Sequence, residues 1–321
     1  MSEFEATQTP ENNGGDQSEK PLIDEVSPDV AEAVSEFMAK AAEANEAEAE
    51  ASAESSIFAA GAGLAAAEFA APSGPYISFE HVFKSFGDFV VLQDVSFFVN
   101  PGETLCILGR SGVGKSVSLQ MLMGFLTPDS GSVMVAGQSL AGMTERALQE
   151  VRRKVTMVFQ NGALFDSITV GENVAFPLRE LGNMTEDQIL QVVKGLLEMV
   201  GVAGMDNLLP SDLSTGMKRS VAIARALAAQ PAAVLYDEPT TMVDPLMGHL
   251  LGDLIQRLKA QLHLTSIVVT HDMRLAEKLA DRVLFLHEGR ARFFGTVDAM
   301  RESQDPVLRE FLQLDALILP M

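Results

Sequence analysis

Residues 109–116 constrain the fold of this chain more than any other stretch. They read Gly-Arg-Ser-Gly-Val-Gly-Lys-Ser and match the pattern G-x-x-x-x-G-K-[ST]. Glycines let the backbone turn several N–H groups inward around a phosphate, and a helix that begins near Gly114 adds its positive N-terminal end. The pattern needs a strand before it and a helix after it, which residues 104–108 and 117–125 supply. Because such a turn also arises by chance, the rest of the chain must support the assignment.

Four apolar runs, each followed by a turn and a helical pattern, predict a parallel sheet that is covered on both faces. They are residues 104–108, 155–159, 233–236 and 266–270. Shorter β-like runs, broken by Gly, Asp and Pro, lie at residues 77–79, 90–92, 95–99 and 133–135. Between residues 160 and 230 the periodicity is mostly helical, which predicts an inserted helical subdomain. No internal repeat is apparent, so the chain holds one phosphate loop.

Two acids follow one of the buried strands. Residues 233–236 run directly into Asp237, Glu238 and Pro239, which places both carboxylates at the carboxyl end of a strand, beside the phosphate loop. There Asp237 can hold Mg²⁺, and Glu238 can orient and deprotonate an attacking water. A lone Asp-Glu pair is also common in ordinary turns, but here it coincides with the phosphate loop at the expected distance downstream.

Two further residues, taken with these segments, support a resemblance to a known family. Phe86 stands in Lys-Ser-Phe-Gly before Val-Leu-Gln-Asp-Val-Ser, and Gln160 closes Met-Val-Phe-Gln. The order of the segments resembles the nucleotide-binding domain of ATP-binding cassette (ABC) transporters over residues 76–295. In that family the aromatic stacks on adenine and the glutamine senses Mg²⁺ and the attacking water. The resemblance implies these roles for Phe86 and Gln160.

The downstream motifs of the family are matched as well. Residues 213–217, Leu-Ser-Thr-Gly-Met, are similar to its signature, Asp244 in Val-Asp-Pro matches the D-loop, and His271 in Val-Val-Thr-His-Asp matches the switch histidine. The resemblance implies that the serine and glycine of the signature contact the γ-phosphate held by an opposing subunit. Thr215 departs from the pattern, because the family usually has glycine there. A β-branched residue restricts φ and adds bulk, which bears on turnover more than on ATP binding.

The resemblance implies an α/β fold, namely an ABC-type nucleotide-binding domain. It has a RecA-like P-loop core with an antiparallel β subdomain and an inserted α-helical subdomain. The cofactors it implies are ATP and Mg²⁺. The implied nucleotide contacts are Phe86, Gly109, Arg110, Ser111, Gly112, Val113, Gly114, Lys115, Ser116, Ser214, Gly216 and Asp244. The implied metal ligands are Ser116, Gln160 and Asp237, and the implied catalytic residues are Lys115, Gln160, Glu238 and His271. Each chain has one loop and one signature, so two complete sites require a homodimer.

Charge is distributed unevenly along the 321 residues. Of the 44 acids and 23 bases, residues 1–75 hold sixteen acids and two bases, and residues 76–321 hold the other 28 and 21. The net charge is therefore −14 in the first part and −7 in the second. We expect an acidic, Ala- and Glu-rich, disordered tail over residues 1–75, an ABC ATPase domain over 76–300 with its helical subdomain at about 161–230, and a C-terminal helical tail over 301–321. An acidic folded part without a basic block argues against nucleic acid as a partner.

Nothing in the sequence predicts a membrane span. The N-terminus lacks the basic and apolar regions of a secretory signal, and no run reaches the roughly 18 apolar residues that cross a bilayer. The nearest candidate, residues 57–71, is mainly Ala and Gly and contains Glu68. Residues 30–41 have helical apolar spacing, which indicates either a transient solvated helix or a docking helix. The single Cys106 fits a reducing compartment and a buried position.

Residues 161–180, which follow Gln160, narrow the family further. They read NGALFDSITVGENVAFPLRE and, with residues 305–312, resemble the ATPases of Mce-associated lipid transporters, the Mla-like systems. This resemblance implies phospholipid transport that maintains outer-membrane lipid asymmetry. The implied partners are an integral permease, a periplasmic Mce-domain protein and a STAS-domain subunit. The implied location is cytoplasmic, peripheral on the inner membrane.

Several alternatives remain open at the level of sequence. The same ATPase domain could belong to an amino-acid or other small-solute transporter. It could also belong to a soluble cassette protein outside transport, although the sequence has none of the basic, coiled-coil or zinc insertions usual in such proteins. Ala163, Leu164 and Phe165 either line a groove for the permease or belong to the core of the helical subdomain. The apolar residues 312–321 are expected to pack on their own domain or on the dimer partner.

Overall fold

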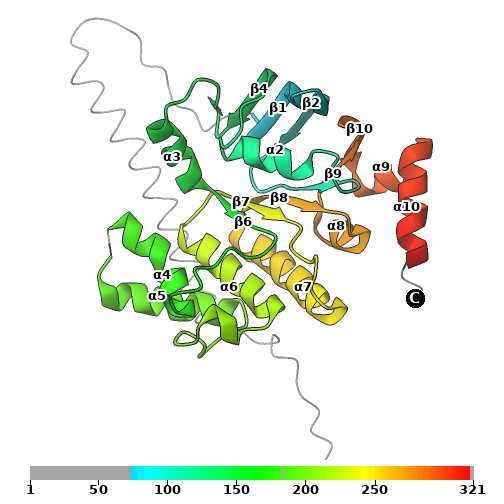
Figure 1. Cartoon of the computed structure of the whole chain (residues 1–321). Coiled ribbons are helices and arrows are strands. Elements are labelled where there is room, and N and C mark those ends of the chain that lie inside the picture. Colours follow the sequence, from blue (N-terminus) through cyan, green and yellow to red (C-terminus); the bar gives the residue numbers. More distant parts are fainter. Residues whose placement is uncertain (1–73, 183, 319–321) are drawn as a thin grey trace, which may run out of the picture.

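The computed structural model describes residues 74–182 and 184–318, with side chains as far as residue 314. These residues form two sheets surrounded by helices (Figure 1). The predicted tail over residues 1–75 and the possible helix at residues 30–41 lie outside the described part, except for residues 74 and 75. Among the described helices, none is long and apolar enough to cross a membrane.

The larger sheet has six strands in the order β10–β9–β3–β8–β7–β6. Its strands are β3 (Thr104–Leu108), β6 (Val155–Val158), β7 (Ala233–Asp237), β8 (Thr265–Thr270), β9 (Arg282–His287) and β10 (Arg290–Thr296). All neighbours pair in parallel except β9 and β10. The four apolar runs therefore form the predicted parallel sheet, and each boundary agrees to within one residue.

Burial on both faces of this sheet explains the continuous apolar runs. Cys106 and Leu108 of β3 pack into one hydrophobic cluster, together with the buried faces of the helices below the sheet. Leu105 and Ile107 point the other way, into a second cluster shared with the antiparallel sheet and α2 (Lys115–Leu122). Cys106 is fully buried, as expected, and burial raises the pKa of its thiol to about 12.

The smaller sheet is antiparallel, with the order β2–β1–β4–β5. Its strands are β1 (Ile77–Phe86), β2 (Phe89–Val99), β4 (Ser130–Val135) and β5 (Gln138–Ser139). The sequence predicted two short runs where the structure has the single strand β2. Its polar residues Gln93 and Asp94 lie at a shift of register between β1 and β2, where Asp94 has φ of 56°. An irregularity of this kind interrupts the apolar pattern without ending the strand.

Helices cover the two faces of the large sheet (Figure 1). Besides α2 they are α3 (Glu145–Lys154), α4 (Val170–Leu181), α5 (Glu186–Met199), α6 (Thr215–Ala228), α7 (Pro245–Leu262), α8 (Met273–Leu279), α9 (Val297–Glu302) and α10 (Pro306–Ile318). Capping boxes start α4 at Thr169 and α5 at Thr185, where the side chains of Glu172 and Gln188 return the hydrogen bond. These two helices pack with α6 below the sheet, and the insertion is helical as predicted.

The C-terminal helix α10 packs against its own domain. Asp305 accepts hydrogen bonds from the N–H groups of Val307 and Leu308 at the start of the helix. Leu308 is fully buried, and the ring of Phe311 lies 5.0 Å from that of Phe285 in β9. Leu312 also packs against the core, whereas Leu314 is 40% exposed. The side chains from residue 315 on lie outside the described part, so the packing of the apolar tail as a whole stays a prediction. Residues 319–321 lie outside the described part of the chain.

Candidate functional site

The phosphate loop joins β3 to α2 in a conformation that only glycine adopts easily. Gly109, Gly112 and Gly114 have φ of 151°, 82° and 103°. A Cβ at Gly109 would stand 2.5 Å from the carbonyl oxygen of Leu286, and one at Gly114 would stand 2.5 Å from the side chain of Leu92. The loop therefore lies in close contact with β9 and β2. Its exposed side, which includes Arg110, is free of this crowding.

Lys115 is folded beneath the phosphate loop. Its side chain is only 6% exposed, and its Nζ donates to the carbonyl oxygens of Gly109 at 2.7 Å and Arg110 at 3.2 Å. The same Nζ lies 3.3 Å from Oε1 of Glu238. The lysine thus places a positive charge between the loop and the acid that follows β7.

Ser116 and Asp237 meet at the carboxyl ends of β3 and β7. The Ser116 hydroxyl donates to Oδ1 of Asp237 at 2.9 Å. Burial raises the pKa of Asp237, while the hydrogen bond from Ser116 opposes that shift. A hydroxyl and a carboxylate side by side form an all-oxygen donor pair, which is the ligand chemistry that Mg²⁺ prefers.

Glu238 sits at a turn that the surrounding structure holds in place. Its φ is 48°, and its N–H donates to the carbonyl oxygen of Val269 at 2.9 Å. Its Oε2 accepts from the Thr241 hydroxyl at 3.0 Å and lies 2.8 Å from Nδ1 of His271. Burial raises the pKa of Glu238, but the hydrogen bond from His271 and the charge of Lys115 outweigh it, so the net shift is downward. The hydrogen bond with Glu238 raises the pKa of His271 in turn.

The side chains of five predicted residues gather in one network, namely Lys115, Ser116, Asp237, Glu238 and His271, and Lys115 extends it to the backbone of Gly109 and Arg110. Phe86 and Gln160 lie outside this network. Phe86 is 48% exposed at the end of β1, with the Nζ of Lys84 5.4 Å from its ring centroid, and Gln160 is exposed just after β6. The order of the motifs along the sequence does not reveal which of the predicted residues contact one another and which do not.

The signature and the D-loop lie at the N-terminal ends of two neighbouring helices. Ser214 caps α6 by accepting from the N–H of Met217 at 3.3 Å, and Asp244 caps α7 by accepting from the N–H of Met247 at 3.0 Å. A Cβ at Gly216 would stand 2.5 Å from Cε of Met247, so the two helix ends are in contact. Thr215 begins α6 and is exposed.

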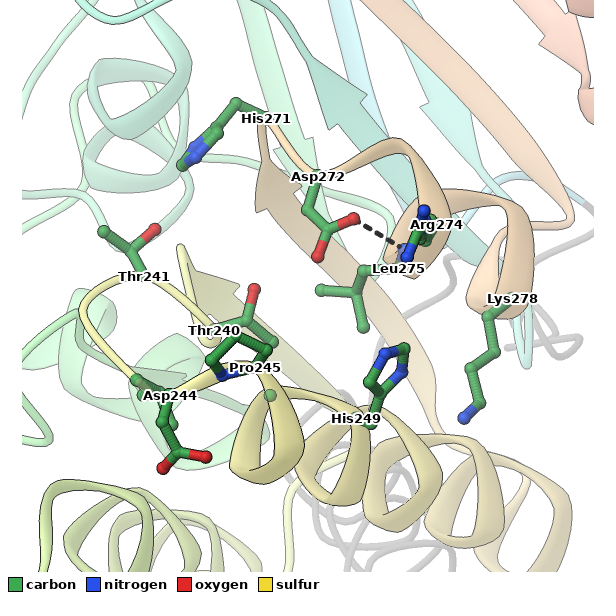
Figure 2. Close-up of a pocket in the computed structure, with 13 residues that line it drawn as sticks. Thr240, Thr241, Asp244, Pro245, His249, His271, Asp272, Arg274, Leu275 and Lys278 are labelled. Atoms are coloured by element: carbon green, nitrogen blue, oxygen red, sulfur yellow. Dashed lines mark hydrogen bonds between the residues drawn. The ribbon is translucent and has the colours of Figure 1, made fainter. Parts of the chain in front are cut away.

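A groove of about 560 Å³ extends from the site along α7 and α8. Figure 2 shows His271 and Thr241 at one end, Asp244 beside them, and Lys278 at the far end. His249 projects from α7 into the groove. The groove therefore continues the active-site surface past the D-loop.

The segment after Gln160 divides between core and surface. Leu164 is half-buried and packs against the main hydrophobic cluster, whereas Ala163 is exposed. Phe165 is 46% exposed, and its ring lies 5.2 Å from that of the equally accessible Phe176 on α4. Leu164 therefore fits the core interpretation, while a permease groove at Ala163 and Phe165 stays a prediction.

Two residues that the structure connects to the site were not predicted from the sequence. Thr241 donates to Glu238, as described above, and Arg219 donates to the carbonyl oxygen of Thr241 at 3.3 Å. Arg219 gave no signal, because Lys218 and Ser220 flank it and the stretch has the pattern of an ordinary helix surface. Thr241 had none, since a threonine in a turn is common.

Comparisons with known proteins identify the class of this chain. A family profile described as ABC transporter matches residues 92–241. A solved dimeric ATP-binding cassette, in a post-hydrolysis state with ADP and Pi, superposes with a TM-score of 0.64 and 30% identity, covering 69% of this chain and 98% of that one. The fold and the site thus define an ATP-binding cassette, and the chain belongs to the family of ABC transporter ATP-binding proteins. Its activity is ATP hydrolysis coupled to transport.

Three curated relatives show which branches of the family it is similar to. The intermembrane phospholipid transport system ATP-binding protein MlaF of Haemophilus influenzae is 39% identical over 227 residues, or 71% of this chain and 86% of that protein. The probable ribonucleotide transport ATP-binding protein mkl of Mycobacterium leprae is 36% identical over 241 residues, or 75% of this chain and 70% of that protein. The methionine import ATP-binding protein MetN of Brucella abortus is 38% identical over 245 residues, or 76% of this chain and 66% of that protein.

Proposed function

We propose that this chain is the ATPase subunit of a phospholipid transporter and drives lipid movement through a separate permease. The observation that carries the proposal is the 39% identity to the phospholipid transport protein MlaF over 86% of its length. The run at residues 161–180, which resembles Mla-like ATPases, supports it independently of the motifs that all ABC ATPases share.

A second candidate is the transport of a small solute. The methionine import protein MetN is 38% identical, almost as similar as MlaF, and the mkl relative is described as a probable ribonucleotide transporter. Since all three share the ATPase engine, the cargo depends on the permease that the chain binds.

The site fits ATP and Mg²⁺. Gly109, Gly112 and Gly114 all have positive φ, a conformation that lets the loop turn its N–H groups toward a phosphate. We assign the β and γ phosphates to Lys115 and the loop N–H groups. Ser116 and Asp237 offer Mg²⁺ two oxygen ligands, and Gln160 would add a third. The metal would supply charge neutralisation at the phosphates.

We assign adenine binding to Phe86 and proton transfer to Glu238. Phe86, half-exposed at the end of β1, offers a face on which the base can stack. Glu238 is ionised, because the groups around it lower its pKa, so it can accept a proton from the attacking water. His271, 2.8 Å away, holds the carboxylate in place.

We further propose a head-to-tail homodimer. Ser214 and Gly216 lie on α6, outside the network around Lys115, so they complete a site only when a second copy supplies them. Asp244 and the groove beside it belong to the proposed dimer face. A solved relative of this fold is dimeric with ADP and Pi, which supports this arrangement.

The proposed assembly adds membrane partners and a domain plan. Phe165 and Phe176 form an exposed aromatic pair at which an integral permease can dock. With the permease we expect a periplasmic Mce-domain protein and a STAS-domain subunit, and a position on the cytoplasmic face of the inner membrane. The domain plan remains a tail over residues 1–75, an ATPase domain over 76–300 with the helical subdomain at about 161–230, and a C-terminal tail over 301–321.

The test of the cargo is reconstitution with the copurified permease. The complex is isolated from detergent-solubilised membranes and placed in vesicles, and ATP-dependent transfer of labelled phospholipid is compared with uptake of labelled methionine. Phospholipid transfer that needs ATP supports the proposal. Methionine uptake without lipid transfer would overturn it in favour of the second candidate.

The test of the assigned base is the variant Glu238→Gln. We expect turnover to fall by at least about a hundredfold, since removing a general base forfeits about 10²- to 10⁴-fold. ATP binding and dimerisation in MgATP should persist, as measured by equilibrium titration and light scattering. Glu302→Gln, on the exposed surface of α9, removes the same charge and serves as the control. Retained turnover in Glu238→Gln would contradict the assignment.

A further inference from the structure

Arg219 is a buried arginine that joins three separate parts of the ATPase. It lies on α6, the helix that follows the signature, and is only 3% exposed. Its Nη1 donates to the carbonyl oxygen of Phe159 at 3.0 Å, and its Nη2 donates to the carbonyl oxygen of Thr241 at 3.3 Å. Phe159 directly precedes Gln160, and Thr241 lies between Glu238 and Asp244.

Stability alone does not account for this arrangement. Burying a guanidinium is costly unless it is paired and fully hydrogen-bonded. Within the described residues, Arg219 contacts two neutral carbonyl groups, and its Nε has no hydrogen-bond partner. An apolar residue would fill the same space without this desolvation. A charge kept at this cost points to a role in positioning the groups it contacts.

A continuous path of hydrogen bonds leads from Arg219 to the carboxylate assigned as the base. Arg219 holds the backbone of Thr241, whose own N–H donates to the carbonyl oxygen of Glu238 at 3.2 Å. The Thr241 hydroxyl then donates to Oε2 of Glu238 at 3.0 Å. His271 approaches that same oxygen, so Thr241 and His271 together fix the direction of the carboxylate.

We propose that Arg219 and Thr241 are positioning residues for ATP hydrolysis, which tie the orientation of Glu238 and the strand end before Gln160 to the signature helix α6. The inference rests on the proposed role of Glu238. Through this connection, a movement of α6 relative to the sheet changes the alignment of the base. The signature of one subunit is thereby coupled to the hydrolytic residues of the same chain.

The predicted effect falls on kcat and spares nucleotide affinity. Neither Arg219 nor Thr241 contacts the phosphate loop through the hydrogen bonds described above, so the affinity for ATP should stay within about twofold. Misdirection of the base should lower kcat by about 10- to 150-fold for Thr241→Val, which matches the loss of one hydrogen bond to a charged group. Thr241→Ser keeps the hydroxyl and should restore most of the rate.

The experiment is a double-mutant cycle on the full-length chain. ATPase kinetics, equilibrium ATP binding and urea unfolding are measured for Arg219→Lys, Thr241→Val and the double variant. Because both residues act through Glu238, the losses in kcat should be less than multiplicative in the double variant. If Arg219→Lys does not fold, Arg219→Gln replaces it, since it carries no charge and keeps an amide donor.

Arg225→Lys is the matched control. Arg225 also lies on α6 and donates to two backbone carbonyls, those of Gly162 and Ala163, away from Thr241. Arg225→Lys should lower the free energy of unfolding about as much as Arg219→Lys does, while its basal kcat should change by less than about twofold. Multiplicative losses in the cycle, or wild-type kcat in Thr241→Val, would refute the inference.

The variant Glu238→Gln separates this inference from the proposed function. If Glu238→Gln retains turnover, the assignment of Glu238 as the base is wrong. The hydrogen-bond path from Arg219 then leads to no catalytic group, so the positioning role is refuted as well. If Glu238→Gln is inactive while the variants at Arg219 and Thr241 turn over normally, only the positioning role is refuted.

Discussion

At the scale of single residues, the site depends on backbone conformations that few side chains tolerate. Gly109 and Glu238 both have φ in the left-handed region, at 151° and 48°. For glycine this costs little, whereas for a residue with a Cβ it costs about 1–2 kcal/mol. Glu238 nevertheless adopts it, and its N–H bonds to Val269 of the neighbouring strand. The sheet thus stabilises a turn that points the carboxylate back toward Lys115.

The first prediction compares two glycines of the phosphate loop. Gly109→Ala should destabilise the chain by more than about 1 kcal/mol, because the new Cβ combines an unfavourable φ with a contact at 2.5 Å to Leu286. Gly112→Ala meets nothing within 4 Å and should suffer only from its φ of 82°. Urea unfolding measures both. Equal losses would show that crowding against β9 is unimportant.

The second prediction concerns the pH dependence of stability. His271 has a raised pKa in the folded chain, so its pairing with Glu238 stabilises fully below the unfolded pKa of about 6.5. That contribution is lost as pH rises through the higher folded pKa. It persists on the acid side until Glu238, whose folded pKa is lowered, becomes protonated. His271→Ala should therefore cost more stability at pH 6 than at pH 9, as measured by urea unfolding. A loss independent of pH would contradict the pairing.

At the scale of elements, one buried side chain organises the loop before α4. Asn173 is fully buried. Its Oδ1 accepts from the N–H of Phe165 at 2.8 Å, and its Nδ2 donates to the carbonyl oxygens of Phe165 and Thr169, both at 3.0 Å. A loop without regular structure is held here by side-chain bonds, which positions Phe165 beside Phe176. The capping box at Thr169 then starts the helix.

The third prediction follows from these bonds. Asn173→Ala should destabilise the chain by about 1–3 kcal/mol, because it leaves buried backbone groups without partners. It should also reduce stimulation of the ATPase by the permease more than the basal rate, since it frees the loop that carries Phe165. Asn207→Ala, at an exposed asparagine of the same region, should change stability by less than about 0.5 kcal/mol. Unfolding and reconstituted ATPase assays measure the two effects.

At the scale of the whole molecule, the chain presents the two halves of a site in different places. The phosphate loop, Asp237 and Glu238 gather at the carboxyl ends of β3 and β7, whereas Ser214 and Gly216 lie at the start of α6, against α7. Both helix ends there carry a capping side chain and a positive N-terminal dipole. In the proposed homodimer, the signature therefore meets the phosphate that the other subunit holds.

The fourth prediction tests this division by mixing two inactive variants. Lys115→Ala disables the loop half, and Gly216→Asp places a repelling carboxylate in the signature half. Each homodimer should be inactive, but a mixed dimer contains one intact site, so ATPase activity should appear on mixing.

The control for mixing pairs Lys115→Ala with Glu238→Gln. Both changes disable the same half, so no mixed dimer has an intact site and no activity should appear. Absence of recovery in the first mixture, or equal recovery in both, would contradict the shared site.

Much of this architecture follows from local pattern. The strands of the parallel sheet could be predicted, because side chains buried on both faces leave a continuous apolar run such as that of β3. The acids after β7 could be placed beside the phosphate loop, since parallel strands end at the same edge. By contrast, β2 was predicted as two strands, because an irregular pairing with β1 depends on a partner that its own residues do not reveal.

The sequence by itself determined the sheet, the phosphate loop and the residues that are candidates to act on ATP, because each follows from residue type and spacing along one segment. Only the tertiary structure decided which of these groups meet within one chain. It also showed that Arg219 donates to Thr241, 22 residues away, and that Thr241 in turn donates to Glu238. The physical reason is that such contacts form between backbone carbonyls and side chains of distant segments. Nothing in the local pattern of either segment encodes the distance between them.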